Sequence, residues 1–114
     1  MKSPGTPASH LDGCRVLAYA AVPHSAEFTG ALRLNVDGAW IGRVPNLAIC
    51  EWDVRHELML MHCDEQWNVV GVQGWNAPGA APPKSVAEVV ALAERYYRGL
   101  GSAWVHVAPF GDRA

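Results

Sequence analysis

The sequence lacks the features that mark several large classes of protein. It has no apolar run near the roughly 20 residues that cross a bilayer. It also has no basic half, because residues 1–57 and residues 58–114 each carry one more acidic than basic side chain. Met1 and Lys2 are followed by Ser, Pro, Gly and Thr instead of the apolar core of a secretion signal. We therefore expect neither a membrane nor a nucleic acid as partner, and we expect a cytoplasmic protein.

Cysteine and lysine are both scarce. The cysteines are Cys14, Cys50 and Cys63, an odd number without a Cys-x-x-Cys pair, which indicates neither a disulfide framework nor a zinc ribbon. Buried, reduced thiols are the expectation. Two lysines stand against seven arginines and seventeen alanines, a bias that we associate with a high-GC bacterial genome.

Length and local composition predict one domain with two tails. The 114 residues match the common size of a single domain, and half of them are hydrophobic. Residues 1–12 contain Pro4, Gly5 and Pro7 and little apolar content, so we expect a disordered N-terminal tail. Residues 13–108 then form the domain, and residues 109–114 form a C-terminal tail.

Apolar side chains alternate along several short segments, as in strands. The segment Glu57–Cys63 carries Leu58 and Leu60 on one side and Met59 and Met61 on the other. Its two apolar faces indicate a central strand, in a hairpin covered on both sides. The predicted strands are Cys14–Ala21, the two arms of a hairpin around Asp37-Gly38, Leu47–Glu51, Glu57–Cys63, Trp67–Gln73 and Ala103–Val107.

The Asp37-Gly38 dipeptide is the clearest turn signal. A two-residue Asp-Gly turn favours a type I′ hairpin, which pairs Leu34 with Ile41 and Leu32 with Arg43 on an apolar face. Trp40 then lies on the opposite, polar face of the hairpin.

One helix is predicted near the C-terminus. Ser85 and Glu88 form a capping box after a Pro-Pro pair, and Gly99 supplies a stop. An apolar stripe follows the helical period, made of Val86, Val89, Val90, Ala93, Tyr97 and Leu100. The predicted fold class is therefore α+β, with an antiparallel, hairpin-rich sheet of about six or seven strands and one amphipathic helix on a face.

No pattern of reactive side chains predicts a catalytic or metal site. His62 and Cys63 are adjacent, but consecutive strand residues point to opposite faces and cannot form a dyad. His56 and His62 would lie roughly 20 Å apart along a strand, too far to share an ion. Glu51 and Asp53 fit two solvated charges near a turn. We assign no catalytic residue, metal or cofactor.

Tryptophan is the enriched residue type, with five in 114 residues. Trp67 and Trp104 fall inside strand patterns and are expected in the core. Trp40 and Trp75 occupy positions where no core needs an aromatic ring, on a polar hairpin face and at the entry to a Pro/Gly loop. They are either exposed or covered by a second sheet face or by the loop of residues 74–83.

Exposed tryptophans beside arginines are typical of protein interfaces. Arg33 and Arg43 accompany Trp40 in the hairpin, and aromatic and guanidinium groups dominate interface energies. Our first hypothesis is a non-catalytic protein-binding module, an adaptor or immunity-like domain, or a homodimer, that binds through Trp40, Trp75, Arg33 and Arg43.

A second hypothesis places a ligand between helix and sheet. In it, a small enzyme or small-molecule-binding protein has an aromatic pocket lined by Trp52, Met61 and Tyr97. A polar group comes from His62 or His106. No residue pattern identifies the ligand.

Overall fold

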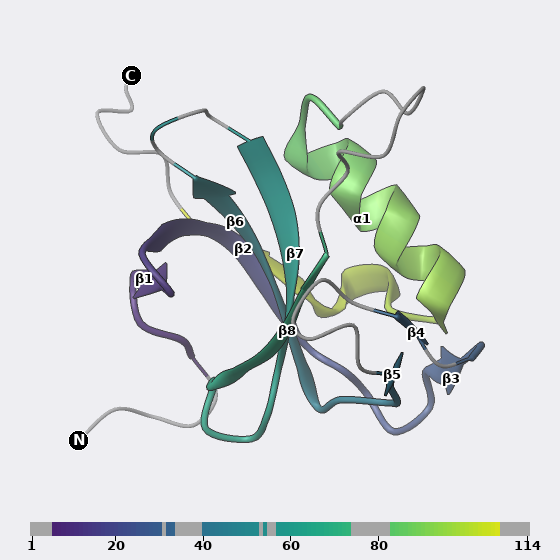
Figure 1. Ribbon diagram of the computed structural model, residues 1–114. Helices are drawn as coiled ribbons and strands as arrows, with labels where there is room; N and C mark the ends of the chain where they lie inside the picture. Colours follow the sequence, from purple (N-terminus) through teal and green to yellow (C-terminus); the bar gives the residue numbers. More distant parts are fainter. Residues whose placement is uncertain are drawn as a thin grey trace.

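The protein is an antiparallel sheet with one helix across a face (Figure 1). The computed structural model describes residues 6–30, 32–33, 40–52, 54, 57–73 and 83–107. Within them, the main sheet has the strand order β1-β2-β6-β7-β8, and β10 pairs with β2 on the same edge as β1. The predicted α+β class is confirmed.

The main sheet consists of β1 (His10–Leu11), β2 (Cys14–Ala21), β6 (Asn46–Trp52), β7 (Glu57–Cys63), β8 (Val69–Gln73) and β10 (Trp104–His106). Two small strand pairs flank it, β3 (Glu27–Phe28) with β9 (Tyr97–Arg98) and β4 (Leu32–Arg33) with β5 (Trp40–Ile41). The helix is α1 (Val86–Tyr96), and a 3-10 turn, η1 (Gly101–Ala103), precedes β10.

Two cores lie on the two faces of this sheet. We call the face under α1 the helix face; its core combines sheet residues such as Leu47 and Leu60 with Val89 and Ala93 of the helix. The opposite face, the far face, has a core of Leu11, Cys14, Val16, Ala48, Cys50, Met61, Cys63 and Trp67. Residues 60–63 of β7 are buried on both sides, which confirms the prediction of a covered central strand.

A β-bulge in β2 lets this one strand supply both cores. The register with β6 shifts between Val16 and Ala18. Since side chains alternate with a period of two, one extra residue exchanges the faces of everything beyond it. Cys14 and Val16 therefore lie in the far-face core, whereas Ala18 and Ala20 lie in the helix-face core.

The helix begins as predicted and ends earlier than its apolar stripe. Ser85 is the N-cap, its Oγ accepting from the Glu88 N–H at 3.2 Å, while Glu88 Oε1 accepts from the Lys84 N–H at 2.8 Å. Tyr97 is already extended and pairs with Phe28. Its hydroxyl accepts from the buried Val44 N–H at 2.9 Å. Tyr97 is buried, as the stripe predicts, but as a strand residue and not a helical one.

One register and one boundary also differ from the sequence predictions. Leu32 pairs with Ile41, a register shifted by two from the predicted one; the Asp37-Gly38 dipeptide lies outside the described residues. His10 and Leu11 pair with β2, so the predicted start of the domain at residue 13 falls inside a hairpin. The apolar Leu11 side chain draws this segment into the far-face core.

The turn between β7 and β8 is organised by Asp64. Its Oδ1 accepts from the backbone N–H groups of Gln66 and Asn68, both at 2.9 Å. Trp67 adopts a left-handed conformation with φ of 65° and packs edge-on against Tyr19 at 5.6 Å between ring centroids. Because of this turn, β8 begins at Val69 and not at Trp67. Trp67 is buried, as predicted.

Candidate interaction site

The four predicted partner-binding residues do not all lie in the same part of the described structure. Arg33 and Trp40 are direct cross-strand partners in the β4–β5 pair, whereas the predicted register, which differs by two residues, made them diagonal neighbours. Trp75 lies outside the described residues. The predicted binding role of these residues stays a prediction.

Arg43 is used inside the chain. Its guanidinium donates to the carbonyl oxygens of Ala26 and Pro23, each at 2.6 Å. These charge-assisted bonds hold the loop between β2 and β3 against the residues that follow β5. Arg43 therefore has a structural role within the chain, and its predicted partner-binding role stays a prediction.

The five residues of the alternative pocket are spread over the sheet. His62 and Tyr97 lie on the helix side, but Met61 belongs to the far-face core. Trp52 is 37% exposed at the end of β6, and His106 is exposed on β10. The alternation of Met61 and His62 along β7 is what separates them, so they do not line one common cavity.

A buried polar cluster does exist on the helix face. His62 is fully buried, and neither of its ring nitrogens has a hydrogen-bond partner among the described residues. The Oε1 of Gln73 is unpartnered in the same sense, while its Nε2 donates to the Tyr96 hydroxyl at 2.8 Å. Burial lowers the pKa of His62 to about 4, against a smaller opposing effect of Gln73. His62 is thus a neutral imidazole at pH 7.

The three thiols are withdrawn from solvent. All are free and buried, which confirms the sequence prediction. Burial raises the pKa of Cys63 to about 12 and that of Cys50 further. Thiols that hold their proton this strongly are poor nucleophiles. Among the described residues, no three His, Cys, Asp or Glu side chains are grouped so that they could hold a metal ion.

Exposed apolar side chains gather at the β10 edge of the far face. Val105 is 47% exposed and Val107 is 36% exposed, and Val105 pairs with Tyr19 of β2. Beside them lies a groove of about 230 Å³. It is lined by Pro7, Ala8, Ser9, Val16, Tyr19 and Val107. We call these six residues and Val105 the valine surface.

The groove forms where β2 changes its edge partner. The Val16 N–H donates to the Ser9 carbonyl at 2.9 Å, and the Leu17 carbonyl accepts from the Val107 N–H at 2.9 Å. The N-terminal segment thus covers the first half of β2 and β10 covers the second half, with the bulge between them. Val16 and Tyr19 lie on either side of this bulge and both face the groove.

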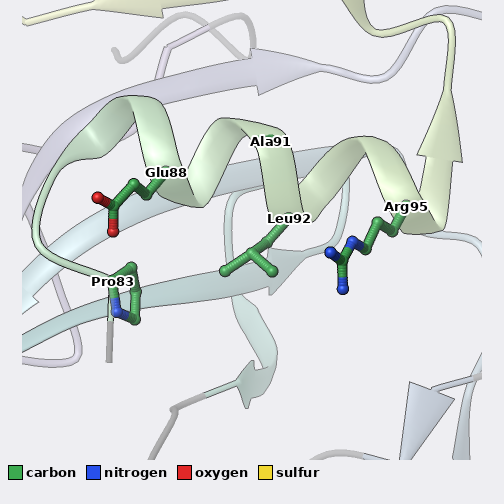
Figure 2. Close-up of a pocket in the computed structure, with 5 residues that line it drawn as sticks. All are labelled: Pro83, Glu88, Ala91, Leu92 and Arg95. Atoms are coloured by element: carbon green, nitrogen blue, oxygen red, sulfur yellow. The ribbon is translucent and has the colours of Figure 1, made fainter. Parts of the chain in front are cut away.

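A second groove runs along the outside of α1 (Figure 2). It has a volume of about 290 Å³ and is lined by Pro83, Glu88, Ala91, Leu92 and Arg95. Figure 2 shows Glu88 and Arg95 at its two ends with Leu92 between them. We call Glu88, Ala91, Leu92 and Arg95 the helix stripe.

Sequence reasoning did not single out the valine surface, although a signal was present. Residues 104–107 alternate Trp, Val, His, Val, so both valines point away from the face that buries Trp104. What the sequence did not show is that β10 is an edge strand paired with β2, which leaves the valines exposed.

Comparisons with known proteins place the chain in no family. No family model, no curated protein and no solved structure matches it. Within the described part of the chain, no helix has the length and apolar character needed to cross a membrane. Its chemistry must therefore be inferred from its own residues.

Proposed function

We propose that the protein is a non-catalytic protein-binding module whose binding site is the valine surface. The observation that carries this proposal is the pair of exposed valines, Val105 and Val107, beside a groove with an apolar floor. Contiguous exposed apolar surface on a small domain is typical of a protein interaction site. The groove receives an apolar side chain of the partner, and the valines flank it.

The composition of the valine surface favours a protein partner. None of its seven residues is an Asp, Glu, Lys, Arg or His. A neutral, apolar surface gains free energy by losing water and offers no cation to a phosphate group. These properties suit the apolar centre of a protein interface better than a nucleic acid.

The placement of the reactive groups also supports a binding role. His62 and the three thiols are buried, so none of them offers a reactive group at the valine surface. The exposed side chains of the valine surface include two valines, Val105 and Val107. The described part of the molecule therefore presents contact area to a partner.

The contribution of the valines can be tested by charge. Fully burying a valine is worth about 1.5–3 kcal/mol, so two valines that are about one third to one half exposed contribute roughly 2 kcal/mol together. Replacing both by aspartate, Val105→Asp with Val107→Asp, also puts two carboxylates into the interface. We expect affinity for a partner to fall at least about 30-fold.

The measurement is quantitative capture from native extract followed by titration calorimetry with the captured protein. The matched control is Val54→Asp, the same change at a position that is 77% exposed on the β6–β7 hairpin. A partner that binds the wild type and Val54→Asp equally but not the double variant supports the proposal. Equal binding by all three proteins contradicts it.

The buried polar cluster supports a second candidate function, small-molecule binding between α1 and the sheet. His62 and Gln73 have three polar atoms there without a hydrogen-bond partner in the described part of the chain, and such atoms orient ligands in apolar sites. A small polar ligand would change the nitrogen chemical shifts of the His62 ring in an NMR titration. Unchanged shifts across a fragment library would contradict this function.

A further inference from the structure

The helix stripe is an amphipathic surface turned away from the core. Its residues are spaced i, i+3, i+4 and i+7, which places them on one side of α1 (Figure 2). Ala91 is exposed and Leu92 is half-buried, whereas Val89 and Ala93 of the same helix are fully buried. The stripe therefore exposes a small and a large apolar side chain between an acid and a base.

The order of residues along the stripe is self-complementary. Glu88 and Arg95 are equally far from the midpoint between Ala91 and Leu92. If a second copy of α1 lies antiparallel, with a twofold axis through that midpoint, Glu88 of each copy faces Arg95 of the other. In the same register Ala91 of each copy faces Leu92 of the other. A twofold interface requires this kind of complementarity.

We propose that the chain forms a homodimer through the antiparallel pairing of two helix stripes. The occupant of the α1 groove is thus a second copy of this chain, with Leu92 of the partner subunit seated beside Ala91. This inference goes beyond the proposed function and uses the other side of the sheet from the valine surface. A dimer could then bind two partner molecules.

The charged groups at the two ends are available for this pairing. One carboxylate oxygen of Glu88 accepts from the Lys84 N–H, which fixes the carboxylate at the start of the helix. The other oxygen can accept from a guanidinium of a second copy. The Arg95 guanidinium makes no ion pair with a described carboxylate. Two Glu88–Arg95 pairs across the axis would satisfy both groups, and a parallel arrangement would set like charges together.

The small side chain at the centre allows close approach. Alanine at a helix contact lets two axes pack about 8 Å apart. The groove of about 290 Å³ beside Ala91 has room for a leucine side chain. Because α1 has only 11 residues, the contact is smaller than the roughly 800 Å² per partner of a standard interface. We therefore expect a weak dimer.

The test is sedimentation equilibrium from about 10 µM to 1 mM, with reversed charges. Glu88→Arg alone and Arg95→Glu alone each bring like charges together twice, and each is expected to weaken the dimer at least about tenfold. An equimolar mixture of the two variants restores both attractive pairs and should associate at least as strongly as the wild type. Glu65→Arg, in the exposed β7–β8 turn, is the matched control and should dimerise normally.

A steric variant protects the test against loss of the helix cap. Glu88→Arg removes a capping interaction, so circular dichroism must show unchanged helicity. Ala91→Trp changes an exposed residue and leaves Glu88 and Arg95 in place. Its large side chain should abolish the dimer by preventing close approach of the two helices. A wild type that stays monomeric to 1 mM, or variants that fail to complement each other while remaining helical, would overturn the proposal.

The two proposals fail separately. The variant with Val105→Asp and Val107→Asp should keep the wild-type dimer constant, because the valines lie on the far face. Loss of dimerisation in this variant and not in Ala91→Trp would assign self-association to the valine surface and refute pairing through α1.

Discussion

Acidification should destabilise the protein through one buried histidine. His62 has a pKa of about 4 in the folded protein, because burial disfavours its charged form, and an ordinary pKa of 6.5 when the chain is unfolded. The unfolded chain therefore takes up the proton first. The full stability is present above pH 6.5 and is lost as the pH falls towards 4.

The size of this effect follows from the two pKa values. Between pH 7.5 and pH 5.0, His62 becomes almost fully protonated in the unfolded chain, whereas in the folded protein its ring stays largely neutral. Linkage gives a loss of about 2 kcal/mol over that interval, rising to about 3 kcal/mol below pH 4. Urea unfolding followed by tryptophan fluorescence at the two pH values measures it directly.

The variant His62→Leu separates this residue from the other titrating groups. Its apolar side chain suits a position between Leu47 and Gly71 in neighbouring strands, and it carries no proton. Asp64 stays ionised between pH 7.5 and pH 5.0, because the Asn68 N–H lowers the pKa of its carboxyl from the ordinary value of 3.8. If wild type and His62→Leu lose the same free energy between pH 7.5 and pH 5.0, the reasoning is refuted.

Two further predictions concern the core. The three thiols should react with a disulfide reagent at pH 8 only as fast as the domain unfolds, because the cysteines are buried and burial raises the pKa of Cys50 and Cys63. In guanidinium all three should react at once. Rapid labelling of any cysteine in the native protein would contradict this prediction. Tyr97→Phe should lower the free energy of unfolding by about 1–2 kcal/mol, because it leaves the Val44 N–H buried without its acceptor, and an unchanged urea midpoint would show that this bond contributes nothing.

The sequence predicted those strands whose pattern is fully determined by burial. Cys14–Ala21 and Glu57–Cys63 agree with the structure to the residue. The bulge in β2 was not predicted, because an extra residue inside an apolar run leaves the apolar composition unchanged. Its effect appears only in the way that Val16 and Ala18 face different cores.

Register and termini were harder for the same physical reason. A shift of two residues keeps each side chain on its own face, so alternation alone could not separate the Leu32–Ile41 pairing from the Leu34–Ile41 pairing. The helical period likewise placed Tyr97 on the buried stripe, which is correct for burial. Pairing with Phe28 then decided that it is a strand residue.

The candidate site was the least predictable part. Trp67 and Trp104 are core residues, as their strand patterns predicted. Trp40 and Trp75 drew attention because large aromatic groups dominate many interfaces, and their binding role stays a prediction. The exposed valines at the β10 edge are individually ordinary residues. Only the pairing of the last strand with β2 puts them beside the N-terminal segment.

The shared edge of β2 has a mechanical consequence. The bond from Val16 to Ser9 and the bond from Val107 to Leu17 lie on neighbouring residues, so the two ends of the described chain leave the sheet at almost the same point. A force applied to both ends would peel β1 and β10 from β2 in opposite directions, one hydrogen bond at a time. The central strands β6 and β7 would bear no load until β1 and β10 had both separated from β2. The domain should therefore unfold under force in small steps that begin at this edge of the sheet.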